Sequence, residues 1–393
     1  MLMFSRLRQA CRYRFYSTTL SPISSAPLSS RDKTRATITL LKNEENPERI
    51  LDICRAATLT DTNLDKFALS LSISRLSESN YFEGIRQLLE ELKTRPGLRN
   101  ERFLSHAIAL YGEANMLDHA IRSFEQMDEL GIPRSAKSLE ALILACVLAK
   151  NYKEVSRIYV EFPKIYGIEP NLYVYNLVIK AFCESGSSSS AYSILAEMDK
   201  KNVKPNDITF GNMFVGFYKE EKLEDVEKVL KLMEEYGIRP GVDMYNIRIK
   251  SLCTLNRSSD AKALVDGMIS RGIEPNSVTY RRLIHGFCLE GNLEEANKLF
   301  TDIKGRGRKP DVECYFDLIH FLCLRGDFEA ALDICRESMK QDWFPNFETM
   351  RILVKGLASI SKVDDARRLI KKIKKKFKSN TTRWNEIEAG LPQ

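Results

Sequence analysis

Proline recurs at intervals of 35 residues from residue 170 onward. The six prolines are Pro170, Pro205, Pro240, Pro275, Pro310 and Pro345. An aromatic series runs in phase with them at Tyr175, Phe210, Tyr245, Tyr280 and Tyr315, and a small-residue series follows at Ala191, Val226, Ala261, Ala296, Ala331 and Ala366. Three series that share one period indicate a tandem structural repeat, because each copy needs the same residue type at the same point.

One repeat contains the pattern of two helices joined by a turn. Apolar residues recur every three or four positions through Tyr245–Cys253, which predicts a helix with one face against a core. A second amphipathic helix is expected from about Asp260. Gly272 can adopt the left-handed conformation that ends this helix, and Pro275 prevents its continuation.

Counting from the three series divides residues 31 to 381 into ten units. They are residues 31–65, 66–100, 101–135, 136–171, 172–206, 207–241, 242–276, 277–311, 312–346 and 347–381, and a C-terminal tail follows at 382–393. The unit at 136–171 is one residue longer than the others, and we expect a loop to absorb the extra residue. A single helical hairpin cannot bury its apolar stripe, so neighbouring hairpins must stack. The predicted fold is an all-α solenoid of about ten repeats.

The first thirty residues differ in composition from the rest. They contain seven serines and no acidic residue, and their basic residues are Arg6, Arg8, Arg12 and Arg14. This composition predicts an organelle transit peptide at 1–30, and the dense arginines favour the mitochondrial matrix over the chloroplast. A basic tail that carries no targeting information is the alternative interpretation.

Positive charge is concentrated at the other end of the chain. Four of the +7 formal charges belong to residues 1–30, and residues 367–393 hold nine basic and two acidic residues, which leaves residues 31–365 at −4. The basic cluster predicts phosphate contacts with a nucleic acid, although such a charge run also occurs as a solvated helix face. The predicted phosphate-binding residues are Arg367, Arg368, Lys371, Lys372, Lys374, Lys375, Lys376 and Lys378.

Three short strings carry a family resemblance. They are Tyr175-Asn-Leu-Val-Ile179, Ala191-Tyr-Ser-Ile-Leu-Ala-Glu-Met198 and Gly272-Ile-Glu-Pro-Asn276. The chain resembles the pentatricopeptide repeat proteins of the P class, in particular the small plant mitochondrial type, and is similar to members built into the mitochondrial ribosome. Tetratricopeptide repeats fit less well, because Trp343 and Trp384 do not stand early in a first helix. The resemblance is specific over residues 172–346 and fainter over 31–171 and 347–381.

The resemblance implies a right-handed superhelix whose first helices line its concave side, and a function in binding RNA. In this family each repeat presents two or three side chains to one nucleotide. Carried onto this sequence, the base readers are Asn176 with Asn206, and Asn246 with Asn276. Two Asn-Asn pairs imply a pyrimidine, because an amide offers both a donor and an acceptor. Each asparagine is alternatively a turn or helix-cap residue.

Four other pairs at these positions depart from the family pattern. Gly211 and Gly241 lack side chains, and we expect Arg281 and Asp311 to pair with each other. The remaining pairs are Phe316 with Asn346 and Arg351 with Thr381. Few repeats therefore carry a residue pair that fits the family pattern. Contact with the shape or the phosphates of a structured RNA becomes an alternative to sequence-specific recognition.

Residue patterns for catalysis, metals and membranes are not found in the sequence. The nine cysteines form no CxxC pair, and four of them, Cys183, Cys253, Cys288 and Cys323, stand at multiples of 35, which predicts buried core positions. No histidine has a glutamate two residues on, and no apolar run of roughly 18 residues occurs. We therefore expect no enzyme activity, cofactor, metal, membrane or small-molecule substrate. His285 and His320, 35 residues apart, mark a repeated helix position.

Two functions follow from these observations. The first is a non-catalytic RNA-binding protein of the mitochondrion that acts in organelle RNA metabolism or translation on single-stranded or ribosomal RNA. The alternative is a structural subunit of the mitochondrial ribosome, with ribosomal proteins as partners. A purely protein-binding scaffold is a third and weaker hypothesis.

Overall fold

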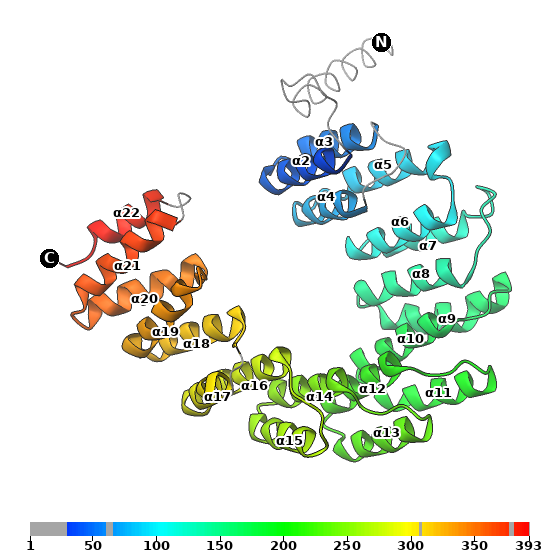
Figure 1. The fold of residues 1–393 in the computed structure, drawn as a ribbon. Helices are drawn as coiled ribbons and strands as arrows, with labels where there is room; N and C mark the ends of the chain where they lie inside the picture. The colour runs from blue at the N-terminus through cyan, green and yellow to red at the C-terminus, as the bar shows by residue number, and fades with distance from the viewer. Residues whose placement is uncertain (1–29, 60–65, 306–308, 377–380, 393) are drawn as a thin grey trace, which may run out of the picture. The chain divides into compact units, whose positions relative to one another are not determined.

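The computed structural model describes residues 30–59, 66–305, 309–376 and 381–392, and within these ranges the side chains from residue 35 onward except those of 57–59. Every regular element in these ranges is a helix (Figure 1). The all-α fold predicted from the sequence is therefore confirmed. The transit peptide predicted for residues 1–30 lies outside the described residues, apart from Ser30. No described helix has the length and apolar content needed to cross a bilayer.

The chain divides into two compact units at Pro205. In the first unit the helices form five consecutive pairs, and the first helix of each pair packs on the first helix of the next (Figure 1). The pairs are α2 (Ser30–Asn43) with α3 (Pro47–Leu59), α4 (Lys66–Glu78) with α5 (Phe82–Lys93), α6 (Glu101–Glu113) with α7 (Leu117–Glu125), α8 (Ala136–Leu148) with α9 (Tyr152–Tyr166), and α10 (Leu172–Glu184) with α11 (Ala191–Lys200). Two short 3-10 turns, Pro96–Leu98 and Ser188–Ser190, complete this unit.

The second unit contains five further pairs and one additional helix. The pairs are α12 (Asp207–Lys219) with α13 (Leu223–Glu235), α14 (Val242–Thr254) with α15 (Ser258–Ser270), α16 (Ser277–Leu289) with α17 (Leu293–Gly305), α18 (Val312–Arg325) with α19 (Phe328–Lys340), and α20 (Phe347–Ser359) with α21 (Val363–Lys376), and the additional helix is α22 (Thr381–Ala389). As in the first unit, the first helices α12, α14, α16, α18 and α20 pack in succession, and each second helix packs on its own partner. The unit therefore has one layer of first helices and one of second helices.

The proline series separates consecutive pairs. Each proline lacks the N–H that a continuing helix requires, and the residue after it caps the next first helix with a side-chain oxygen in five of the six cases. The capping residues are Asn171, Asn206, Asn276, Asp311 and Asn346. At the sixth place Gly241 has no side chain to offer. A two-residue signal thus ends one hairpin and begins the next.

The aromatic series forms the centre of each hairpin. Tyr315 is 1% exposed, and its hydroxyl donates to Oε1 of Glu337 on α19 at 2.8 Å. Burial, together with this carboxylate, raises the pKa of Tyr315 to about 12, so the hydroxyl stays protonated and remains a donor. The tyrosine therefore both fills the core and joins the two helices of its hairpin.

Close contact between first helices requires glycine at one point. A Cβ on Gly286 of α16 would collide with Sγ of Cys253 on α14 and would stand 2.7 Å from Oγ of Ser258. Cys253 is itself buried, as are Cys183, Cys288 and Cys323, which confirms the core positions predicted for the cysteine series. Small residues at these points let α14 and α16 approach each other.

One expectation about the longest unit is wrong. Its extra residue does not lie in a loop but extends the second helix, since α9 has 15 residues where α13 has 13. The helix continues until Gly167, whose φ of +64° is the left-handed conformation that ends it.

The segment 382–393, expected from the sequence to be a tail, contains most of helix α22. Trp384 of α22 is 2% exposed, and its ring centroid lies 4.9 Å from that of Phe347 on α20. The additional helix therefore packs against the last hairpin and covers part of its apolar surface.

Candidate functional site

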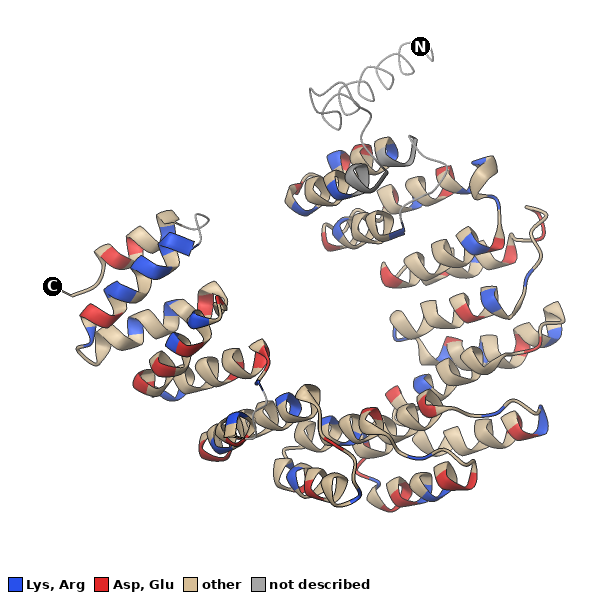
Figure 2. Ribbon diagram, viewed as in Figure 1, with Lys and Arg blue, Asp and Glu red and all other residues tan. Residues whose placement is uncertain are grey.

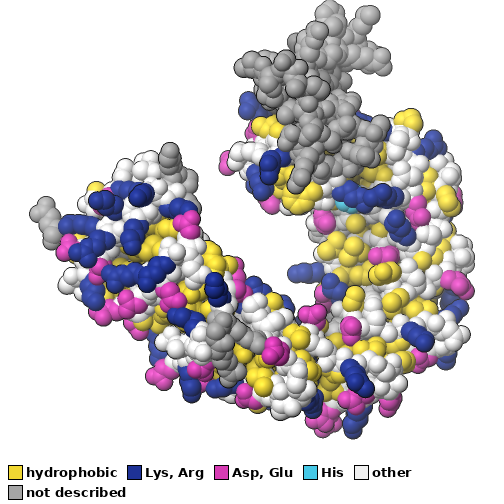
Figure 3. Space-filling model, in the orientation of Figure 1, with side chains coloured by type: hydrophobic (Ala, Val, Ile, Leu, Met, Phe, Trp, Pro, Cys, Tyr) yellow, Lys and Arg dark blue, Asp and Glu magenta, His cyan; other side chains and the backbone are white. Residues whose placement is uncertain are grey.

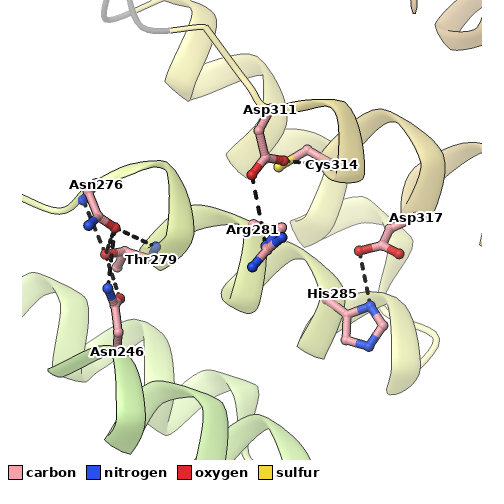
Figure 4. Close-up of polar contacts among 8 residues, drawn as sticks. All are labelled: Asn246, Asn276, Thr279, Arg281, His285, Asp311, Cys314 and Asp317. Atoms are coloured by element: carbon pink, nitrogen blue, oxygen red, sulfur yellow. Dashed lines mark hydrogen bonds and ion pairs between the residues drawn. The ribbon is translucent and has the colours of Figure 1, made fainter. Parts of the chain in front are cut away.

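A buried amide lies at the contact between α14 and α16. Asn246 is 2% exposed, and its Oδ1 accepts a hydrogen bond from Oγ1 of Thr279 at 2.7 Å (Figure 4). Its Nδ2 donates to Oδ1 of Asn276 at 3.3 Å. Buried amides need such partners, because an unsatisfied polar group in the core is destabilising. The structure thus brings together two of the predicted base readers, Asn246 and Asn276.

Asn276 has an exposed side chain and caps α16. Its Oδ1 accepts from the backbone N–H of Thr279 at 3.0 Å and lies 3.1 Å from Oγ1 of the same residue. A backbone N–H can only donate, so the cap determines which end of the amide is oxygen. The Nδ2 group is then directed away from the cap, and no hydrogen bond within the described residues uses it as a donor. The result is an exposed donor held in a fixed orientation.

Asn206 plays the same capping role at the start of α12. Its Oδ1 accepts from the backbone N–H groups of Ile208 and Thr209, both at 3.1 Å, and from Oγ1 of Thr209 at 3.2 Å. Asn176, the reader paired with it by the resemblance, is 5% exposed and lies on α10 of the first unit. The cap interpretation left open by the sequence is therefore correct for both Asn206 and Asn276.

The pairs that depart from the family pattern make contacts within the protein. Nε of Arg281 lies 3.8 Å from Oδ2 of Asp311, which confirms their expected pairing (Figure 4). Nε of Arg351 donates to Oε2 of Glu348 on the same helix at 2.9 Å. Asn346 caps α20 by accepting from the backbone N–H of Thr349 at 2.8 Å. In these pairs, both arginine side chains thus contact acidic neighbours within the protein.

His285 and a carboxylate border a cleft on the first helices. Nδ1 of His285 lies 3.0 Å from Oδ2 of Asp317 on α18, and this hydrogen bond raises the pKa of His285 despite partial burial (Figure 4). The cleft has a volume of about 370 Å³. Its lining combines basic Lys250, Arg281 and Arg282 with acidic Glu313 and Asp317. The mixture of signs leaves little net charge for one kind of ligand.

The basic cluster of α21 separates into paired and unpaired side chains. Lys374 pairs with Glu388 of α22, Lys376 pairs with Asp342, and Nη2 of Arg367 donates to the carbonyl of Pro392 at 2.9 Å. Nη1 of Arg368 lies 3.7 Å from Oδ1 of Asp365. The described residues supply no ion pair to three exposed lysines, which are Lys371, Lys372 and Lys375. Lys378 lies outside the described residues.

The sequence reasoning missed the role of threonine in this site. Thr209, Thr279 and Thr349 each stand three residues after a capping asparagine, and Thr279 in addition contacts the preceding first helix. The spacing is that of a capping box, in which the third helical residue returns a bond to the cap. Searching for this spacing in phase with the prolines would have found all three. No group of metal-ligating side chains occurs in the part of the chain that the structure covers.

Sequence comparisons agree with this geometry. The PPR repeat family matches residues 170–219 and 240–289, and the pentatricopeptide repeat domain matches residues 122–185. A mitochondrial pentatricopeptide repeat-containing protein of Arabidopsis thaliana is 54% identical over 389 residues, which cover 98% of this chain and 96% of the relative. The chain belongs to the pentatricopeptide repeat family. The name of this relative also confirms the predicted mitochondrial location of this pentatricopeptide repeat protein.

Other relatives of this pentatricopeptide repeat protein belong to a ribosome. The small ribosomal subunit protein mL103 of Arabidopsis thaliana is 32% identical over 252 residues, which cover 63% of this chain and 61% of the relative. Among solved structures, yeast Rmd9p in complex with a 16-nucleotide target RNA is similar with a TM-score of 0.48 and 12% identity. That match covers 93% of this chain and 80% of Rmd9p.

Proposed function

We propose that this protein is a non-catalytic RNA-binding protein of the mitochondrion, acting in organelle RNA metabolism or translation. The observation that carries the proposal is the exposed Nδ2 of Asn276, which the cap of α16 holds in one orientation beside buried Asn246. A donor that is already oriented loses little conformational freedom when it meets a base. The pair Asn246 and Asn276 is therefore suited to read one nucleotide.

The donor character of Asn276 specifies which base is preferred. Cytosine presents N3 as an acceptor at the centre of its Watson–Crick edge, whereas uracil presents an N–H at that point. A fixed amide N–H favours the acceptor, so the pair reads cytosine before uracil. Asn246 contributes by donating a hydrogen bond from its own Nδ2 to Oδ1 of Asn276, which helps to fix the orientation of that amide.

A titration with short single-stranded RNA tests this assignment. Two oligonucleotides that differ by cytosine or uracil within an otherwise constant sequence are bound to the full chain and to its Asn246→Ala and Asn276→Ala variants. Each variant is expected to lose ~1 to 3 kcal/mol of binding to the cytosine-containing RNA. Equal affinity of the wild-type chain and both variants for both RNAs would refute the base-reader assignment.

A structural subunit of the mitochondrial ribosome is the second candidate function. It is supported by the relatives that are small ribosomal subunit proteins, including mL103 and mS79 of Arabidopsis thaliana. It is also supported by charge, because residues 31–365 carry −4 while the basic cluster lies at one end. A body that contacts proteins and an end that contacts ribosomal RNA would have this distribution.

Sedimentation of the tagged protein from mitochondrial lysate separates the two functions. A free RNA-binding protein should migrate in light fractions that shift further after ribonuclease treatment. A protein built into the ribosome should migrate with one ribosomal subunit and remain bound to it at high salt, because salt screens only the contacts between solvent-exposed charges. Each outcome excludes one of the two candidates.

A further inference from the structure

The three lysines of α21 that lack an ion pair among the described residues lie on the layer of second helices. A groove of about 380 Å³ runs between α19 and α21 in the second unit. Its floor is apolar and consists of Leu332, Met339 and Leu369. Figure 3 shows basic side chains gathered over the C-terminal helices of this unit, with hydrophobic surface between them. The groove has a different position from the base readers, which lie on the first helices.

The charge balance of this groove is unlike that of the neighbouring contacts. Between α15 and α17, Nζ of Lys262 lies 2.6 Å from Oε2 of Glu295, and between α17 and α19, Nζ of Lys304 lies 2.7 Å from Oε1 of Glu337. In each of these two pairs a glutamate of the next hairpin neutralises the lysine. The acidic residues of α21 are confined to its first turn, whereas basic residues occupy the rest (Figure 2).

Asp365 is the one acidic residue among the described residues that line the groove, and it is already neutralised. Nη2 of Arg336 donates to Oδ1 of Asp365 at 2.7 Å, and Nη1 of Arg368 lies 3.7 Å from the same oxygen. Three lysines then remain exposed without an ion pair among the described residues: Lys371, Lys372 and Lys375. The groove therefore carries a net positive charge.

We propose that this groove, hereafter the α19/α21 groove, binds the sugar-phosphate backbone of base-paired RNA. The inference rests on the proposed RNA-binding function and adds a second class of RNA to it. Phosphate oxygens complement the unpaired ammonium groups, and Arg368, Lys372 and Lys375 follow one side of the helix over about 10 Å, long enough for several phosphates. Association through such contacts releases counterions and weakens with salt.

The lining of the groove argues against a single strand. Proteins that bind single strands stack the bases on aromatic side chains, and sequence readers use amides. Among the described residues, those that line the groove include neither an aromatic nor an amide side chain. Duplex RNA, by contrast, is recognised through its shape and its backbone, for which cations are sufficient.

The packing of α21 also argues against a membrane surface. Ile370 and Ile373 on its apolar side are 0% and 3% exposed, because they pack into the hairpin. A helix that binds a bilayer inserts such residues into the lipid. Helix α21 therefore presents positive charge to a partner but has no free apolar face that it could insert into a bilayer.

Competition between two RNAs tests the proposal on the full chain. The probes are an RNA hairpin with a stem of about 16 base pairs and an unstructured cytosine-containing strand of equal length. The variant carries Lys371→Gln, Lys372→Gln and Lys375→Gln. Its matched control carries Lys200→Gln, Lys201→Gln and Lys204→Gln, which removes the same charge from exposed lysines at the end of α11. Circular dichroism confirms equal helicity before binding is measured.

The groove variant is expected to lose about tenfold or more in affinity for the hairpin and to flatten its salt slope by about 2 to 3, while its affinity for the single strand changes less than about twofold. The control should match the wild-type chain on both RNAs. Equal losses on both RNAs, or an equal loss in the control, would overturn the proposal, as would wild-type hairpin binding by the groove variant. Stronger capture of an acidic polypeptide than of the hairpin would also overturn it.

The same titration separates this inference from the proposed function. If the single strand still requires Asn246 and Asn276 but the hairpin ignores the three lysines, the groove assignment is wrong and the RNA-binding function stands. If the wild-type chain binds neither RNA, both are wrong.

Discussion

Thr279 donates its hydroxyl hydrogen to the buried Oδ1 of Asn246 at 2.7 Å, across 33 residues of sequence. The bond joins the first turn of one first helix to the face of the preceding one. It also fixes the amide of Asn246 so that its Nδ2 meets Asn276. The stability of the hairpin stack and the orientation of the base readers thus depend on the same hydrogen bond.

Replacing Thr279 with valine should destabilise the protein. The substitution keeps the shape of the side chain but leaves Oδ1 of Asn246 buried without this donor, and such a loss costs about 1 to 3 kcal/mol. Thr279→Ser retains the hydroxyl and serves as the control. Urea unfolding followed by circular dichroism measures both variants, and an unchanged midpoint for Thr279→Val would contradict the role of the bond.

The Asn276→Asp variant should change the base preference of its repeat from cytosine to uracil. A carboxylate still caps α16 but presents an acceptor where the amide presented a donor, so uracil should be preferred over cytosine. A change of about fivefold or more in the ratio of the two dissociation constants is expected from the loss of one matched hydrogen bond. Asn276→Ser, which caps the helix without an outward amide, should show no preference. Retention of cytosine preference by the aspartate variant would exclude Asn276 as a reader.

Gly286→Ala should destabilise the contact between α14 and α16. The added methyl group would collide with Cys253 and stand 2.7 Å from Oγ of Ser258, and overpacking of this kind costs about 1 to 3 kcal/mol. Gly267 of α15 is the matched control, because a Cβ there meets nothing within 4 Å. Gly267→Ala should instead raise stability by about 0.5 to 1 kcal/mol through helix propensity. Thermal unfolding should therefore shift in opposite directions for the two variants.

The pair of His285 and Asp317 should stabilise the fold at low pH. The hydrogen bond that His285 donates to Asp317 raises the pKa of His285 in the folded chain, whereas partial burial and Arg281 oppose the shift. A raised folded pKa means that the contribution is complete below the unfolded value of about 6.5 and is lost as the pH rises through the folded value. Asp317→Asn should thus lower the melting temperature more at pH ~5.5 than at pH ~8.5. An NMR titration should place the His285 midpoint higher in the wild-type chain than in this variant.

Much of the fold was predictable because repetition makes local signals visible. A single Pro-Asn pair is a weak mark, but Pro205-Asn206 and Pro275-Asn276 at the same phase locate the ends and starts of helices. The extra length of α9 was not predictable in the same way, because the helix continues until Gly167, which adopts the left-handed conformation that ends it. The periodicity also did not predict that α22 packs on the last hairpin through Trp384, since that helix belongs to no repeat.

The candidate site was only partly predictable. The sequence indicated which asparagines share a phase, and it indicated that Arg281 and Asp311 would pair. It did not indicate that Asn246 is buried, because burial of that residue depends on the distance between α14 and α16. Likewise, the basic residues of α21 look equivalent in sequence, and the positions of Glu388, Asp342 and Asp365 distinguish the neutralised from the available cations.

The packing of Trp384 against Phe347 has a consequence for association between molecules of this protein. The outer surface of a terminal hairpin resembles the surfaces buried between hairpins, so an uncovered one would accept a hairpin from another molecule and begin a polymer. Helix α22 covers part of that surface through Trp384. The helix that lies outside the periodic pattern thus reduces the apolar area on which a hairpin of another molecule could stack.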